Sequence, residues 1–160
     1  MTLLHRALAA TALALSAFAA GAQTWPDKTV KLIAVFPPGG SVDQVARVLA
    51  QQLTKQLGQS VVVENIGGAS GSIGTAAVAK AAPDGTTFGV VFDTHGTNPS
   101  LIPNIAFDTM KGLEHVTLIG TSPMALVASS KSKYMKFADV IADARSIKGI
   151  TIGSIGTGSL

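Results

Sequence analysis

A run of apolar and β-branched residues, VKLIAVF at positions 30–36, leads directly into Pro37-Pro38-Gly39-Gly40. Such a run favours a buried strand, and the Pro and Gly residues end it in a turn. Ser41, with Gln44 three residues later, is typical of a helix start, and apolar residues then recur at helical spacing as far as Leu57. The sequence therefore predicts a strand, a turn and a helix with Ser41 as its N-cap and Gly58 as its C-cap.

The same order repeats in the next stretch of the chain. SVVVE at 60–64 is a second strand, the Gly- and Ser-rich residues 67–72 lead into a small-residue helix over 73–82, and TFGVVF at 87–92 is a third strand. Short connections between alternating strands and helices require parallel pairing through right-handed crossovers. We therefore expect an α/β fold with helices on the faces of a parallel sheet.

The pattern loosens after Asp93, where 98–104 is rich in turn residues. Further on, we expect strands at 115–119, 124–129 and 150–154 and an amphipathic helix over 137–146. The change near residues 98–109 divides the mature chain into a first lobe, 23–105, and the start of a second lobe, 106–160. Because a loop that should open a helix follows the last strand, we expect this sequence to be the N-terminal part of a longer protein.

Composition excludes several classes of function. The 160 residues are 47% hydrophobic and 13% charged, which is typical of a globular protein and argues against a disordered tail. The net charge of +3 comes without a run of like charges, so a nucleic-acid partner is not expected. Without Cys, the chain has no disulfide, no thiol catalysis and no zinc-thiolate or iron-sulfur site.

The N-terminus is typical of a secretory signal peptide. A basic start at 1–6 precedes a short apolar stretch at 7–20, and Ala20-Gly21-Ala22 matches a small-residue cleavage site. We expect cleavage before Gln23 and secretion of the mature chain. An uncleaved membrane anchor is the alternative, although a spanning helix needs about 20 apolar residues.

Three Gly- and Ser-rich loops, at 37–43, 66–72 and 156–160, follow predicted strands. In an open α/β sheet such loops meet at the carboxyl edge, where ligands bind. The N-terminus of a helix presents unpaired N–H groups and a positive dipole end, so it can bind a carboxylate or phosphate without Lys or Arg. Ser41 and Asp43 are the polar side chains of the first loop. Capping and first-turn preferences explain both residues equally well, so a purely structural role stays open.

Catalytic motifs are poorly supported. The glycine spacing of Gly153 and Gly158 matches a phosphate-binding Walker loop, but Ser159 replaces its Lys. His95 and His115 have no second metal ligand four residues away, and we interpret them as a loop residue and a strand residue. Asp139 and Asp143 are expected on the solvated side of one helix. The sequence thus favours binding over catalysis, and no cofactor or metal is expected.

Several motifs together resemble the periplasmic substrate-binding proteins of the tripartite tricarboxylate transporters, the Bug family. The resemblance runs in order from about residue 25 to the end of the chain. Its motifs are WPDK at 25–28, FPPGGSVD at 36–43, LGQ at 57–59, VVVEN at 61–65, GASGSIG at 68–74, VAKAAPDG at 78–85, FADVI at 137–141 and GTGSL at 156–160.

This resemblance implies a two-lobed periplasmic binding protein fold, with the second lobe incomplete in this chain. It implies capture of a small carboxylate, such as a di- or tricarboxylate, an amino acid or an aromatic acid, and delivery to the permease subunits of a membrane transporter. A sensor of the same fold and, less favoured, a secreted hydrolase are the alternatives. The ligand-binding residues that the resemblance implies are Phe36, Pro38, Gly39, Gly40, Ser41, Asp43, Thr94, Gly156, Gly158 and Ser159.

Overall fold

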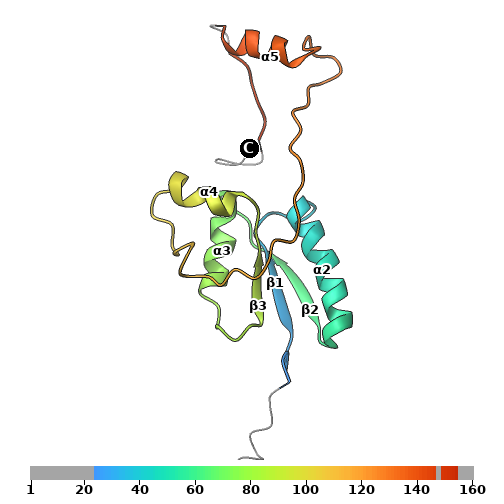
Figure 1. The fold of residues 1–160 in the computed structure, drawn as a ribbon, viewed down its shortest axis with the longest axis vertical. Coiled ribbons are helices and arrows are strands. Elements are labelled where there is room, and N and C mark those ends of the chain that lie inside the picture. Colours follow the sequence, from blue (N-terminus) through green and yellow to red (C-terminus); the bar gives the residue numbers. More distant parts are fainter. Residues whose placement is uncertain (1–23, 147–148, 155–160) are drawn as a thin grey trace, which may run out of the picture.

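The computed structural model describes residues 24–146 and 149–154 (Figure 1). The expected signal peptide and the loop at 156–160 lie outside these residues. The helices and strands are, in chain order, β1 (Val30–Ala34), α2 (Ser41–Leu57), β2 (Val61–Asn65), the short 3-10 helix η1 (Ala69–Gly71), α3 (Ser72–Ala79), β3 (Thr87–Val90), α4 (Thr94–Leu101) and α5 (Phe137–Ala144).

The three strands form a parallel sheet in the order β2-β1-β3, which confirms the predicted α/β class. Val30 pairs with Val61 on one side of β1, and Lys31 pairs with Thr87 on the other. β1 is therefore the central strand. Because all three strands run in the same direction, the loops that leave their carboxyl ends lie along one edge of the sheet (Figure 1).

The core lies on both faces of β1. Val30, Leu32 and Ala34 share one face of the strand and form a buried cluster with Val42 and Ala46 of α2. Val35 extends the other face, where it approaches the start of α3: a Cβ atom added at Gly71 would lie 2.9 Å from Val35 Cγ2. Alternation along the strand thus divides the buried residues between two helices, which cover opposite faces of the sheet.

Element boundaries differ from the predictions in instructive ways. Gly40, and not Ser41, is the N-cap of α2, and no side chain caps the helix there. Gly58 is the C-cap as predicted, with a left-handed φ of 67° and its N–H bonded to the carbonyl oxygen of Thr54. The second helix starts earlier than predicted because residues 69–71 already form a turn of 3-10 helix. α4 forms where the sequence indicated only turns or short helical pieces.

The strands predicted at 115–119, 124–129 and 150–154 are absent from the structure. A strand needs a neighbour to complete its backbone hydrogen bonds, and these segments have no ladder partner among the described residues. The helix predicted at 137–146 is present as α5, at the far end of two extended connections (Figure 1).

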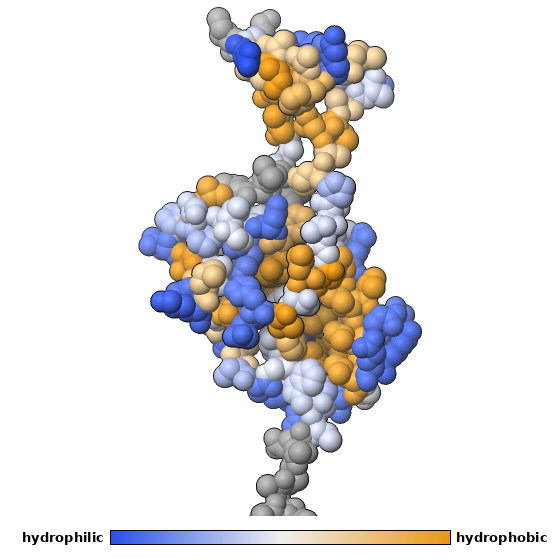
Figure 2. Space-filling view, viewed as in Figure 1, coloured by the Kyte–Doolittle hydropathy of each residue, from blue (hydrophilic) through white to orange (hydrophobic). Residues whose placement is uncertain are grey.

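Residues 105–154 contain no buried residue among those described. Apolar surface gathers around α5 and over the body below it (Figure 2). The large apolar side chains that this region exposes are Met110, Val116, Leu118, Ile119, Met124, Leu126, Val127, Met135, Phe137 and Ile152. The compact part of the described structure therefore ends near α4.

Candidate functional site

The loops after β1, β2 and β3 meet at the carboxyl edge of the sheet. The N–H of Ile66 donates to the carbonyl oxygen of Ala34 across 3.0 Å, which holds the start of the second loop against the end of β1. Phe36 and Phe92, which follow β1 and β3, contact each other edge to face with ring centroids 6.3 Å apart. The sheet thus brings together the first two Gly-rich loops that the sequence singled out.

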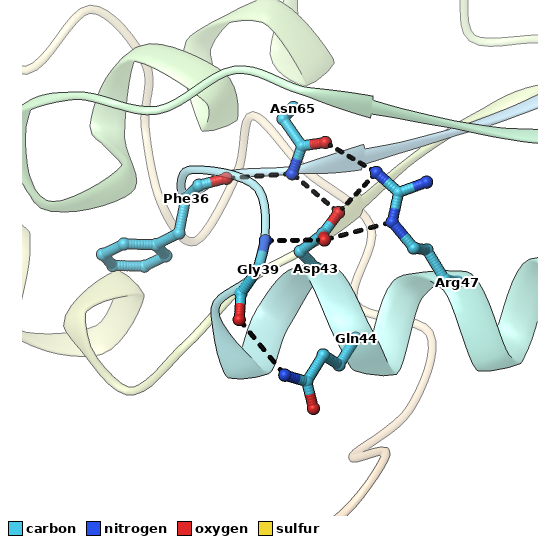
Figure 3. Close-up of polar contacts among 6 residues, drawn as sticks. All are labelled: Phe36, Gly39, Asp43, Gln44, Arg47 and Asn65. Carbon is cyan, nitrogen blue, oxygen red and sulfur yellow. Dashed lines mark hydrogen bonds and ion pairs between the residues drawn. The ribbon is translucent and has the colours of Figure 1, made fainter.

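The first loop is held in shape by a buried carboxylate (Figure 3). The side chain of Asp43, in the first turn of α2, folds back toward the turn before it. Its Oδ2 accepts a hydrogen bond from the N–H of Gly39 at 2.9 Å. Gly39 has a φ of +86°, a conformation that favours glycine, so the turn and the carboxylate fit each other.

Arg47 and Asn65 complete this arrangement (Figure 3). Arg47, one helical turn after Asp43, donates from Nε to Oδ2 at 3.0 Å and pairs from Nη2 with Oδ1 at 3.0 Å. Asn65, at the end of β2, donates from Nδ2 to Asp43 Oδ1 at 2.9 Å and to the carbonyl oxygen of Phe36 at 3.1 Å. The turn before α2, the first turns of α2 and the more distant end of β2 are therefore joined at one carboxylate.

These contacts keep Asp43 ionised. Its hydrogen bonds from Arg47, from the Gly39 N–H and from Asn65 lower the pKa of the Asp43 carboxyl to about 2. The side chain is only 5% exposed, and both of its oxygens accept hydrogen bonds from the protein. Asp43 therefore acts on the shape of the loop, while Arg47 supplies the charge that balances it.

The other predicted residues of this loop lie open to solvent. Pro38, Gly39, Gly40 and Ser41 are exposed, and Phe36 is half-buried. The N–H groups of the first residues of α2 have no acceptor within the helix. Together with the dipole of a 17-residue helix, these donors favour an anion at the turn. The electrostatics suit a carboxylate that is bound by backbone groups.

Thr94, the predicted site residue after β3, lies in a different environment. It is 1% exposed at the start of α4, where its N–H donates to the side chain of Asp93 at 2.8 Å. One turn later, Asn98 donates from Nδ2 to the carbonyl oxygen of Ser70 at 2.9 Å and so ties α4 to η1. Thr94 is thus a buried residue that packs beneath the carboxyl edge of the sheet. The remaining predicted residues, Gly156, Gly158 and Ser159, lie outside the described residues.

Sequence reasoning missed Arg47 and Asn65. The spacing of Asp43 and Arg47 is a helical ion pair that could have been found from the sequence. Nothing local indicates that Asn65, at the end of another strand, would join them.

The two acids of α5 that were expected on a solvated helix face have hydrogen-bond partners in the structure. Asp139 accepts from the N–H of Lys136 at 3.1 Å, and Asp143 accepts from the hydroxyl of Tyr134 at 3.0 Å.

One cavity of the described structure lies away from the loops. It has a volume of about 880 Å³ and is lined by residues around 125–137 and 150–153. Its walls are the extended connections and α5, whose side chains are largely exposed. The loop edge, by contrast, is an open surface on a packed sheet, as expected for one wall of a cleft between two lobes.

A family model described as the tripartite tricarboxylate transporter family receptor matches residues 45–160. The chain belongs to this receptor family. One relative, Protein BugT of Bordetella pertussis, is 40% identical over 130 residues, which cover 80% of this chain and 40% of BugT. The match confirms the resemblance that the sequence motifs indicated.

Solved structures of the family share the fold. The periplasmic binding protein BugD is 41% identical with a TM-score of 0.53, covering 55% of this chain and 29% of BugD. MatC of Rhodopseudomonas palustris, solved with bound malate, is 37% identical with a TM-score of 0.50, covering 55% of this chain and 30% of MatC. Another protein of that organism, solved with adipate, is 34% identical with a TM-score of 0.51. The match covers 54% of this chain and 29% of the adipate-bound protein.

The matched relatives are longer than this chain, which spans 40% to 49% of their lengths. The receptor family comprises periplasmic solute-binding proteins that bind carboxylates. Within the described residues, no helix is both long enough and apolar enough to cross a bilayer.

Proposed function

We propose that this receptor-family chain belongs to a periplasmic protein that captures a small carboxylate and delivers it to the permease subunits of a tripartite tricarboxylate transporter. The observation that carries the proposal is the exposed turn at 37–40. This turn directly precedes α2, and the hydrogen bond from the Gly39 N–H to the Asp43 carboxylate holds its shape. The relatives solved with malate and with adipate support a carboxylate as the ligand class.

In this proposal the ligand carboxylate binds to backbone donors at the start of α2. The Gly39 N–H is taken by Asp43, so the N–H groups of Gly40 and Ser41 and the Ser41 hydroxyl are the donors for the ligand. Phe36 and Pro38 shape the wall of the site, and Thr94 supports the neighbouring junction. Because dipoles and not a cation meet the ligand, its binding remains weak enough for release to the permease.

The rest of the predicted site comes from the other side of the cleft. Gly156, Gly158 and Ser159 would approach the carboxylate from the second lobe, which starts near residue 106, while residues 23–105 form the first lobe. The signal peptide at 1–22 would bring the protein to the periplasm and be removed there. No catalytic residue and no cofactor take part, so closure of the lobes and release of an unchanged ligand complete the cycle.

A thermal-shift experiment with matched ligands tests this function. Malate and adipate are compared with adipamide, which keeps the length of adipate but lacks its charges. A ligand that binds only the folded chain stabilises it by about 2.7 kcal/mol at a hundred times its Kd. We expect at least one carboxylate to raise the melting temperature. Adipamide should leave the melting temperature unchanged. Equal shifts with adipate and adipamide, or no shift with any carboxylate in a panel of di-, tri- and aromatic acids, would contradict the proposal.

A further inference from the structure

The side chains of His95 and His115 meet although 20 positions separate them in the sequence. His95 is in the first turn of α4, and His115 lies on the extended segment that leaves the compact part of the chain. Their Nε2 atoms are 3.4 Å apart, which is a long hydrogen bond, and their ring centroids are 5.6 Å apart. One ring must therefore donate from its Nε2 while the other accepts at its own.

The surroundings of His95 decide which ring donates. The Nδ1 of His95 is buried without a hydrogen-bond partner. A buried N–H without an acceptor is tolerated less well than an unpaired acceptor, so neutral His95 carries its proton on Nε2. His95 is then the donor and His115 the acceptor. The ring of Phe107 is stacked on His95 with centroids 6.2 Å apart and planes 4° from parallel, which holds the donor in this orientation.

This hydrogen bond requires both imidazoles to be neutral. A second proton on His95 would occupy the buried Nδ1, and a proton on the Nε2 of His115 would bring two N–H groups head to head. An exchange of roles fails for the same reason, because His95 would then carry its proton on Nδ1. We propose that the contact between His95 and His115 is a pH-sensitive latch, closed when both rings are neutral and open in mild acid, that ties the segment at 115 to α4.

The charges around the latch favour its opening in acid. Burial and, after it, the charge of His115 lower the pKa of His95 from the ordinary 6.5. Among the acids nearest in the sequence, Asp93 and Asp108 accept from backbone N–H groups and Glu114 is exposed. The short helix η1, which α4 contacts, has no titratable side chain. The latch therefore contributes fully above about pH 6.5 and is lost as the pH falls through the lowered pKa of His95.

Opening of the latch would change how the chain leaves the compact part of the structure. It would free the segment at 115 from α4, while the parallel sheet and its core contain no histidine and would stay intact. In the proposed function the chain beyond residue 106 enters the second lobe, so an open latch would loosen the link between the lobes. This consequence rests on the proposed function, whereas the latch itself does not.

Nuclear magnetic resonance of the full chain tests the latch without any ligand. Imidazole ¹⁵N shifts give the tautomer, and Overhauser cross-peaks between the two rings report their contact. At about pH 7.5 we expect His95 with its proton on Nε2 and clear cross-peaks between the rings. At about pH 5 the cross-peaks should be at least about fivefold weaker, as expected for the loss of one hydrogen bond. Circular dichroism at both pH values checks that the fold is kept.

His115→Gln is the informative variant, because a Gln side chain accepts a hydrogen bond without gaining a charge. We expect His95 to titrate at a higher pH in this variant than in the wild type, since the repulsion from His115 is gone. Cross-peaks between His95 and residue 115 should also persist to a lower pH. The matched control is His5→Gln, which removes the chain's third histidine and should leave both titrations unchanged.

Three results would overturn the proposal. The first is a proton on Nδ1 of His95 at pH 7.5, and the second is the absence of cross-peaks between the rings at that pH. The third is cross-peaks of equal strength at pH 7.5 and pH 5 in the wild type. Because none of these experiments includes a carboxylate, their outcome is independent of the proposed transport function.

Discussion

Residues 24–104 and residues 105–154 differ in the burial of their apolar side chains. The first region holds every buried residue that the structure describes, and its apolar core packs α2 against the three-stranded sheet. The second has Leu118, Val127 and other apolar residues largely exposed. A run of apolar residues becomes a strand only where a neighbouring strand can complete its hydrogen bonds, and only the first region provides one.

A pair of identical substitutions should produce the largest difference between the two regions. Leu32 is 3% exposed in β1, and Leu118 is 79% exposed. We expect Leu32→Ala to lower the free energy of unfolding by about 2–5 kcal/mol, because it leaves a cavity in the core. Leu118→Ala should change it by no more than about 0.5 kcal/mol. Urea unfolding followed by circular dichroism measures both, and equal losses would show that residues 105–154 have a core of their own.

A glycine pair should give a smaller difference of the same kind. A Cβ atom at Gly74 would collide with the carbonyl oxygen of Ile66 and lie 3.0 Å from Val35 Cγ1, whereas nothing lies within 4 Å of one at Gly120. We expect Gly74→Ala to cost about 1–3 kcal/mol of stability, because the core must move to accept the methyl group. Gly120→Ala is the control and should unfold like the wild type in the same urea titration. A stable Gly74→Ala variant would mean that α3 packs less closely than described.

The smallest effect of the three is expected from the buried carboxylate, and it depends on pH. The folded pKa of Asp43, about 2, lies below the ordinary value near 3.9. Its contribution to stability is therefore complete above about pH 4 and is lost as the pH falls toward 2. Asp43→Asn should unfold at a lower urea concentration than the wild type at pH 7, and the two should converge as the pH falls from 4 to 2. A difference that stays constant over this range would contradict the assigned pKa.

The sequence was sufficient for the local elements of the first region. Periodicity, Gly58 and the Pro-Gly turn predict β1, α2 and their connection because these signals act over a few residues. It was not sufficient for the contacts that join distant segments. Asn65 reaches Asp43 only because β2 pairs with β1, and His115 reaches His95 only because the chain returns past α4. The wrong strands at 115–119, 124–129 and 150–154 have the same origin, since pairing is not a local property.

The turn at the start of α2 is the proposed ligand site, where backbone N–H groups would bind the ligand carboxylate. Gly40 allows a clean test, because its φ of −76° suits any residue and an added Cβ atom would meet only the carbonyl oxygen of Pro37, at 3.5 Å. Calorimetric titration of the wild type, Gly40→Val and the control Gly120→Val with the best carboxylate of the panel is the most direct measurement. We predict that Gly40→Val binds more than about tenfold more weakly, or roughly 1.4 kcal/mol, and that Gly120→Val binds like the wild type. Unchanged affinity in a folded Gly40→Val variant would contradict the claim.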